Sequence, residues 1–347
     1  MRQRNGSAAY VAVRLVRDKL LAFAAWVVLG VAIGASGTGA AQAQDKVAGF
    51  PSRPVKLVVP YPGGNLPDAV ARILATQLGD SLGQAFVVDN RPGAGGVVAI
   101  DAVTKSIPDG HTLLFGDPGP IVIAPAQSRA MLQSVTRDLV PVSLLGTSHF
   151  FLVVPASLGV SSLSEFIALA KARPGTLNYA STGPGGIHHL MMETLKADAG
   201  IDVVHVPYKG GPQGVVGLLG GEVSVMFSSL SAITSQVKGG TLKVLAVASP
   251  RRAVLYPDVP SFAELGYPGM NFRGDFGIFA PAGTPAPVIR SLAAAVRNAV
   301  LDAKVTERLN GLGVEPIGST PEAAAAYWKA EGEKYAKAVR LVGLEPN

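Results

Sequence analysis

Short apolar runs alternate with amphipathic stretches along almost the whole chain after residue 50. Uninterrupted apolar runs are typical of buried parallel strands, and apolar positions at helical spacing are typical of surface helices. Strands are predicted at residues 55–59, 85–88, 112–115, 150–154, 178–180, 203–206, 223–227 and 243–248. Helices are predicted after Asp68 and at residues 163–172, 186–199, 214–219, 285–299 and 321–342. The alternation predicts an α/β fold with mainly parallel sheets flanked by helices.

Two of the predicted strands run into Gly/Pro-rich turns that open helices, at residues 61–68 and 181–186. In the first turn, Gly63 and Gly64 permit a close approach of the backbone, and Asp68 is placed to cap the helix. A helix N-terminus carries free N–H donors and a partial positive charge, so it suits an anion. Either loop alone is more typical of a plain turn. Together they could close on one anionic ligand from two halves of the chain.

Polar groups at other strand ends extend this candidate site. Ser181 and Thr182 place hydroxyl groups beside glycines with no adjacent charge, which suits a carboxylate bound through neutral hydrogen bonds. A third turn, which begins at Gly116 and Asp117, also follows a predicted strand. Ligands of open α/β sheets bind at the carboxyl ends of strands, where all of these turns are expected.

Tyr208 and Lys209 follow a further predicted strand and have two interpretations of equal weight. They could face a cleft, where Lys209 would add a cation for an anionic ligand. They could equally form a surface turn with a solvated lysine.

The glycine-rich stretch 90–96 resembles a dinucleotide fingerprint but fails in detail. Val98 stands where a small third residue is required, and no acidic residue ends the next strand at the expected distance. Nucleotide binding is therefore not expected. Arg91 is expected to tie this loop to the core.

The sequence offers little support for catalysis or for metal and cofactor binding. The chain has no cysteine, and His188 and His189 are adjacent, so they cannot face one metal ion as an i,i+4 pair does. Ser181 with His189 could form a hydrolase pair, but nothing marks an acidic partner that would orient the histidine. A helix-start histidine satisfied by loop carbonyls is the favoured interpretation. No cofactor is expected.

The N-terminus has the order of a secretory signal: basic residues, an apolar run of about fifteen residues, and an Ala-Gln-Ala site that predicts cleavage after Ala43. The apolar run is short of the ~20 residues that span a bilayer. Residues 1–43 hold five Lys/Arg and one Asp, so they contribute most of the formal net charge of +6. The rest of the chain is nearly neutral and shows no basic stripe, so no nucleic-acid partner is expected.

Several stretches together resemble the periplasmic solute receptors of tripartite tricarboxylate transporters, also called Bug receptors. The resemblance covers essentially the whole chain after the signal. Its most specific part is the combination of residues 90–96, in a matching stretch that begins at Val88, with residues 108–114. The other matching stretches are 51–62, Asp68 with Ala71-Arg72, 179–183, His189 to Glu193, 206–210, Arg251 with Leu255, 257–260, Glu264 and 280–285.

The resemblance implies a two-lobed periplasmic binding protein fold that closes on its ligand, with no catalysis. Residues 50–150 plus 272–347 would form lobe 1 and residues 151–271 lobe 2. The ligand would be a small carboxylate (a di- or tricarboxylate, an acidic amino acid or an aromatic acid), gripped by backbone amides and handed to a membrane permease. A periplasmic monomer is expected. The expected ligand-binding residues are Tyr61, Gly63, Gly64, Asn65, Leu66, Asp68, Gly116, Asp117, Ser181, Thr182, Gly183, Gly185, His189, Pro207, Tyr208, Lys209, Ser228 and Asp275.

The chain departs from the family pattern at two places that bear on specificity. The first loop has Gly63-Gly64-Asn65-Leu66-Pro67 where Pro-Pro-Gly-Gly or Pro-Ala-Gly-Gly is usual, and Asp275 lies where a Trp-x-Gly is often found. If Asp275 faced the cleft, it would hold a ligand ammonium or repel a second carboxylate; it could equally be a solvated loop charge. Two alternatives to transport remain: an exported hydrolase using Ser181 and His189, and a ligand-dependent partner of a membrane sensor.

Overall fold

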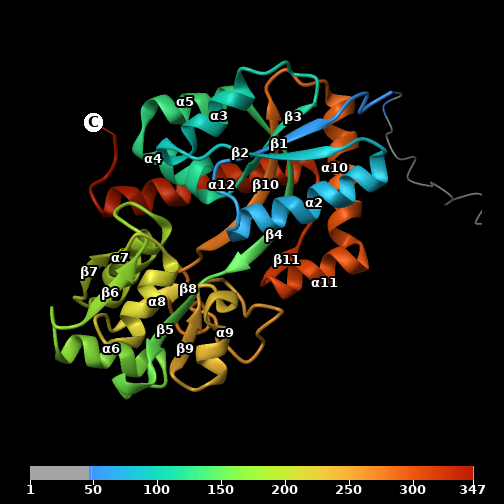
Figure 1. Cartoon of the computed structure of the whole chain (residues 1–347). Helices are drawn as coiled ribbons and strands as arrows, with labels where there is room; N and C mark the ends of the chain where they lie inside the picture. Colours follow the sequence, from blue (N-terminus) through green and yellow to red (C-terminus); the bar gives the residue numbers. More distant parts are fainter. Residues whose placement is uncertain (1–46, 48, 347) are drawn as a thin grey trace, which may run out of the picture. The chain divides into compact units, whose positions relative to one another are not determined.

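The structure is a computed structural model in which residue 47 and residues 49–346 are described. The predicted signal segment lies outside this part of the chain. The described residues form two mixed sheets (Figure 1). The first sheet has the order β11 (Val314–Pro316), β4 (Leu139–His149), β10 (Arg273–Pro281), β3 (Thr112–Gly116), β1 (Val55–Val59) and β2 (Phe86–Asn90). The second has the order β7 (Val204–Pro207), β6 (Asn178–Ser181), β8 (Val225–Ser228), β5 (Phe151–Pro155) and β9 (Leu242–Val247).

Most strands within each sheet point the same way, as the alternation of strands and helices predicts. In the first sheet, β1, β2 and β3 pair in parallel, whereas β10 runs against both β3 and β4, and β11 runs against β4. In the second sheet only β5 is reversed. Of the reversed strands β5, β10 and β11, the first two each follow a crossing between the sheets.

The chain passes between the two sheets twice. β4 of the first sheet is followed, after Phe150 alone, by β5 of the second. Residues 248–272 then lead from β9 back to β10 in the first sheet. We therefore propose lobe boundaries near residues 150 and 272, supported by this division of the strands.

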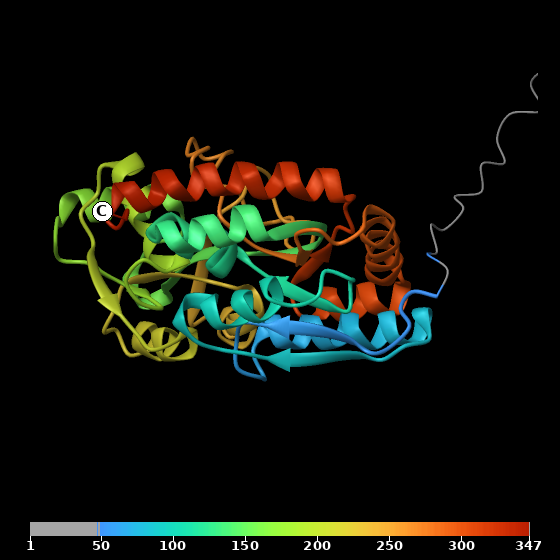
Figure 2. The same ribbon diagram turned by 90° about the horizontal axis from the view of Figure 1, so that it is seen from above.

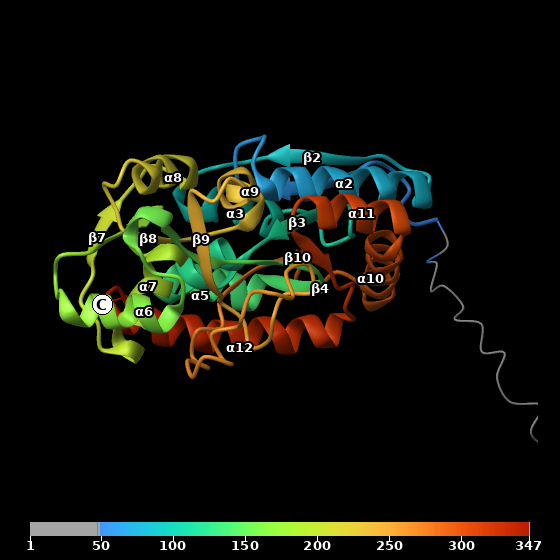
Figure 3. The same ribbon diagram turned by 90° about the horizontal axis from the view of Figure 1, so that it is seen from below.

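Three apolar clusters hold the helices on the sheets. One face of the first sheet is covered by α2 (Leu66–Leu82), α10 (Ala286–Leu301) and α11 (Ala303–Gly311) (Figure 3). The outer face of the second sheet is covered by α8 (Gly211–Leu219) and α9 (Leu230–Lys238). The third cluster joins the remaining faces of both sheets and includes α3 (Val97–Thr104), η2 (Gly119–Ile123), α6 (Leu163–Ala172), α7 (Ile187–Ala199) and α12 (Pro321–Leu341). The shorter elements are η1 (Ala94–Gly96), α4 (Ala124–Gln127), α5 (Arg129–Asp138) and η3 (Ala156–Leu158).

The long helix α12 connects the two halves of this third cluster. It packs against β4 of the first sheet and against α7 of the second (Figure 2). Its Tyr335 is fully buried, and the ring of Phe272 lies 5.5 Å from it at the return crossing. One apolar core therefore continues from one sheet to the other.

The helices predicted from apolar spacing are present with small shifts at their ends, and α6 begins and ends where it was predicted. Two long strands, β4 and β10, were not predicted. In β10, Gly274, Asp275 and Gly277 obscure the apolar pattern of a strand that is buried between two neighbours. In the part of the chain that the structure describes, no helix combines the length and apolar character needed to cross a membrane.

Candidate functional site

A cavity of about 410 Å³ lies where four loops meet, each at the carboxyl end of a strand. Three of the loops follow β1, β2 and β3 of the first sheet, and the fourth follows β6 of the second. Its walls are formed by Pro60, Tyr61, Pro62, Pro92, Gly93, Ala94, Gly95, Gly96, Gly119, Pro120, Ile123, Ala124, Gln127, Pro184, Gly185 and Gly186. The carboxyl ends of strands from both sheets thus converge on one space of the size of small-molecule sites.

The loop after β1 is held by a network around the buried carboxylate of Asp68. Asn65, not Asp68, caps α2: its Oδ1 accepts a hydrogen bond from the Asp68 N–H at 3.0 Å. The Asp68 carboxylate accepts from the Gly64 N–H at 2.9 Å, from Arg72 Nε at 3.0 Å and from Asn90 Nδ2 at 2.9 Å. The hydrogen bond from Arg72 is the main cause that lowers the pKa of Asp68 to about 2. Asp68 therefore fixes the loop.

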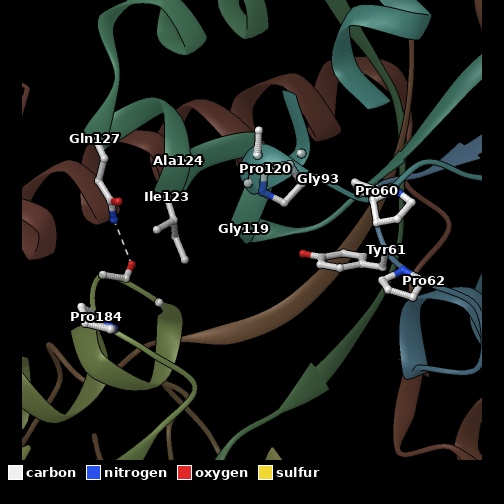
Figure 4. Close-up of a pocket in the computed structure, with 16 residues that line it drawn as sticks. Pro60, Tyr61, Pro62, Gly93, Gly119, Pro120, Ile123, Ala124, Gln127 and Pro184 are labelled. Carbon is white, nitrogen blue, oxygen red and sulfur yellow. Dashed lines mark hydrogen bonds between the residues drawn. The ribbon is translucent and has the colours of Figure 1, made fainter. Parts of the chain in front are cut away.

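Tyr61 and Asp117 join the first loop to the loop after β3. The Tyr61 hydroxyl donates to Asp117 Oδ1 at 2.7 Å, and the same oxygen accepts from the Gly119 N–H at 2.9 Å. Burial raises the pKa of Asp117 to about 6. Burial also raises the pKa of the Tyr61 hydroxyl, and the neighbouring Asp117 carboxylate raises it further. The ring of Tyr61 forms one wall of the cavity, opposite Pro184 and Gln127 (Figure 4).

The loop after β2 needs glycine for both its backbone and its packing. Gly93, Gly95 and Gly96 have φ of 134°, 64° and 102°, which other residues rarely adopt. A Cβ on Gly96 would lie 2.5 Å from the Cβ of Pro120. The stretch that resembled a dinucleotide fingerprint is thus a wall of the cavity. The Arg91 side chain pairs with Asp89 of β2 at 3.0 Å, and its backbone N–H donates to the Val59 carbonyl at 2.8 Å, so Arg91 ties this loop to the first sheet.

Two stacked histidines lie beneath the loop after β6. The rings of His189 and His205 are 4.4 Å apart at 22°, and Tyr179 stacks on His205 at 4.9 Å. His189 Nδ1 accepts from the Gly185 N–H at 3.0 Å, which requires this nitrogen to be unprotonated. Burial lowers the pKa of both histidines, and the neighbouring His189 lowers that of His205 further. The neutral pair therefore positions the loop.

Gln127 connects the two sides of the cavity. It lies at the end of α4, and its Nε2 donates at 2.9 Å to the carbonyl of Gly185 in the opposite loop (Figure 4). A Cβ on Gly185 would approach Gln127 at 2.8 Å and Leu344 at 3.1 Å. Residues from both sheets and from the C-terminal segment thus meet at this glycine.

The cavity suits an anion although none of the 16 residues drawn along its wall is charged. Gly186 is the N-cap of α7 and Gly96 the N-cap of α3, so the first turns of both helices begin at the cavity. The first N–H groups of a helix have no partner within it, and the helix dipole favours a negative group there. Prolines, Ile123 and Ala124 make the rest of the wall largely apolar.

Comparison with known proteins decides the family. The model described as tripartite tricarboxylate transporter family receptor matches residues 70–344. The chain belongs to this receptor family. The protein BugT of Bordetella pertussis is 36% identical over 92% of the receptor and 97% of BugT.

Two ligand-bound structures of similar proteins have the same fold as the receptor. The Rpa4515 protein of R. palustris, solved with adipate, is 32% identical, with a TM-score of 0.75, over 86% of the receptor and all of that chain. MatC from Rhodopseudomonas palustris, solved with bound malate, is 31% identical, with a TM-score of 0.70, over 84% of the receptor and all of that chain. These similarities confirm the two-lobed periplasmic binding protein fold predicted from the sequence.

The receptor is a solute-binding protein and not an enzyme, as its family shows. The hydrolase alternative that paired Ser181 with His189 is wrong. Ser181 Oγ lies 2.6 Å from His205 Nε2 instead, and accepts from the Gly183 N–H at 3.0 Å. Since His189 Nδ1 is engaged by Gly185, these groups stabilise the loop.

The predicted binding residues occupy different places relative to the cavity. Tyr61 and Gly185 line it. The other candidates at the ends of β1, β3 and β6 and in the turns and helix starts that follow are not among the residues that line it. They are Gly63, Gly64, Asn65, Leu66, Asp68, Gly116, Asp117, Ser181, Thr182, Gly183 and His189.

The remaining candidates lie at the ends of β7 and β8 or on β10. Pro207 ends β7, and Tyr208 donates to Glu222 at 2.9 Å, which directs its hydroxyl toward α8. Lys209 is exposed. Ser228 is buried at the end of β8. None of these residues is part of the cavity wall.

Neither interpretation of Asp275 is correct. It lies on β10, is fully buried, and accepts a hydrogen bond from the Tyr327 hydroxyl. Arg273 Nε is 3.8 Å from its carboxylate. Asp275 is therefore neither a solvated loop charge nor part of the cavity wall, because residues distant in sequence enclose it.

Sequence reasoning missed the loop after β2 and the residues from Pro120 to Gln127 as parts of the site. The first could have been found from the argument used for the other turns, because it too follows a parallel strand and is rich in glycine. The second had no local signal. Its role depends on how η2 and α4 turn back toward the loop after β6.

Proposed function

We propose that the receptor binds a small organic carboxylate in this cavity and delivers it to the membrane permease of a tripartite tricarboxylate transporter. The observation that carries the proposal is the convergence of loops from both sheets on one cavity at the starts of α3 and α7. Contacts to both lobes give a ligand a higher affinity for the closed state, which is how such a ligand drives closure.

The wall of the cavity favours an acid with an apolar body. A carboxylate would be held by backbone N–H groups, while Tyr61, Ile123 and the prolines contact the rest of the molecule. An acidic amino acid also carries an ammonium group, which needs an anionic or carbonyl partner. The Asp117 carboxylate, which contacts two residues of the wall, is already bound to Tyr61 and Gly119. Aromatic and aliphatic acids are therefore favoured over amino acids, in keeping with the adipate and malate bound to the related proteins.

The ligand can be identified by mass spectrometry of small molecules released when the purified mature protein is denatured, followed by a thermal-shift screen of carboxylates. A ligand at 100 times its Kd stabilises the folded state by ~2.7 kcal/mol. Calorimetry of the ligand so found then tests the site.

A cavity-filling variant provides the matched test. Ala124 lies on α4 in the cavity wall, so the larger side chain of Ala124→Phe fills the cavity while the helical backbone conformation stays suitable for phenylalanine. Ala130→Phe, at an exposed position of the neighbouring helix α5, is the control. The first variant is expected to lose carboxylate binding, and the second to keep it. Full affinity in a folded Ala124→Phe protein would refute the assignment of the cavity.

A further inference from the structure

A second cavity, of about 320 Å³, lies where the chain crosses between the sheets. It is bounded by the last residues of β4, the start of β10 and the strand β11 from the first sheet. The segment that follows β9 of the second sheet closes it. Its wall shares no residue with the wall of the carboxylate cavity.

The buried side chain in this cavity is that of His149, which is 7% exposed. Among the described residues, neither of its ring nitrogens has a partner in hydrogen-bond geometry. Glu315 Oε1 lies 3.2 Å from His149 Nε2, and the Glu315 carboxylate also accepts from the Leu255 N–H at 3.3 Å. His149 Nε2 thus faces Glu315, whereas the buried Nδ1 has no partner among the described residues, so a bound molecule could engage it.

Three guanidinium groups line the same space. Arg252 Nε donates to Glu264 Oε2 at 3.1 Å, and one Arg252 Nη donates to the carbonyl of Pro257. Arg273 donates from one Nη to the Tyr327 hydroxyl, while its buried Nε has no hydrogen-bond acceptor among the described residues. Arg251 is exposed.

The charged side chains of this wall are three arginines and one carboxylate, that of Glu315, and Thr147 and Ser249 lie beside them. Glu264 and Asp275, outside the wall, offset part of the charge of Arg252 and Arg273, while no carboxylate is paired with Arg251 among the described residues. Arginine presents a planar set of donors that matches the oxygens of tetrahedral and planar oxyanions. We propose that this cavity is a second binding site, for a small inorganic oxyanion of the phosphate type. In its singly protonated form such an ion accepts from the arginines and donates its own hydroxyl to Glu315.

This site differs in chemistry from the site for the transported solute. The wall of the first cavity has no charged side chain, so it relies on backbone donors and apolar contacts. The second cavity would bind its ion through the charged side chains of the arginines. The proposal does not rest on the identity of the transported carboxylate, and each site can be removed without a change to the other.

The test is a calorimetric titration of the mature protein with inorganic phosphate at pH 7, which measures the affinity for phosphate. Arg251→Gln removes an exposed cation from the cavity, so the fold is expected to persist. Phosphate affinity should fall about tenfold or more, because charge-assisted hydrogen bonds to the ion are lost. Arg173→Gln, the same substitution at an exposed position outside the cavity, should leave it unchanged.

Ala124→Phe separates the two cavities. It is expected to keep phosphate binding while carboxylate binding is lost. The proposal is overturned if phosphate shows no saturable binding up to about 10 mM, if Arg251→Gln binds phosphate as the wild type does, or if Ala124→Phe abolishes it.

Discussion

Replacement of Asp68 by asparagine tests how far one buried carboxylate stabilises the receptor. The side chain of Asp68 is 5% exposed and accepts hydrogen bonds from Gly64, Arg72 and Asn90. Asparagine has nearly the same shape but lacks the charge and one acceptor oxygen. The first loop would lose a charge-assisted hydrogen bond, and a donor would be left without its partner.

The magnitude follows from the pKa of Asp68, which is lowered from 3.8 to about 2. At 1.36 kcal/mol per pKa unit, that difference corresponds to roughly 2.4 kcal/mol of unfolding free energy. The side chain of Arg72 is 56% exposed, so solvent screens its part of the interaction. We therefore expect Asp68→Asn to lower the free energy of unfolding by about 1–2 kcal/mol at pH 6.

The pH dependence gives a sharper test than the magnitude alone. A carboxylate whose pKa is lowered by folding stabilises the protein above its unfolded value, near 4, and this stabilisation is lost as the pH falls through about 2. Urea unfolding at pH 6, 4, 3 and 2 should show the difference between wild type and Asp68→Asn shrinking toward zero. Asp80→Asn, at an exposed position on the same helix, is the control and should cost little at any pH. A difference that stays constant from pH 6 to pH 2 would refute the electrostatic explanation.

Three further substitutions probe the cavity wall and the residues that hold it in place. Gly96→Ala should lower the free energy of unfolding by about 2–4 kcal/mol in urea titrations, because a left-handed φ is strained and the new methyl group meets Pro120; a cost below ~0.5 kcal/mol would contradict the packing. His189→Phe keeps a ring in the stack but leaves the Gly185 N–H without its acceptor, and should weaken ligand binding measured by calorimetry. Burial lowers the pKa of His189 from 6.5, so wild-type affinity should fall as the pH drops through that lowered value, and the variant should show a flatter profile. Gln127→Ala removes a hydrogen bond between loops of the two sheets, and should weaken ligand affinity roughly fivefold with little change in Tm; unchanged affinity would show that this bond does not favour closure.

The sequence was sufficient to predict the parts of the fold that depend on local patterns. The buried parallel strands and amphipathic helices such as α6 were read correctly, because burial against one partner leaves a regular spacing of apolar residues. β10 was missed for the opposite reason. Its Asp275 is matched by Tyr327, 52 residues away, and no local pattern shows that such a partner exists.

For the candidate site too, the sequence predicted the positions that depend on local pattern and not those that depend on tertiary packing. Reading loops at the carboxyl ends of strands led to Tyr61 and Gly185, which the structure places in the cavity wall. Roles that depend on side-chain direction were not predictable. His205, which no motif marked, holds Ser181, while Asp68 faces its own loop and not the cavity. Such directions follow from tertiary packing, which a linear sequence does not show.

The contact of Leu344 with the loop of Gly185 bears on how the receptor is produced for binding studies. Leu344 Cδ1 is 3.1 Å from the position of a Cβ at Gly185, so a tag fused just after residue 347 is separated from this contact by only a few residues. An affinity tag fused to the C-terminus would begin beside a wall of the ligand cavity. Affinities measured with such a tag would report on the fusion as well as on the receptor. A tag attached after the predicted cleavage site, ahead of β1, avoids this contact and is the suitable choice for ligand screens.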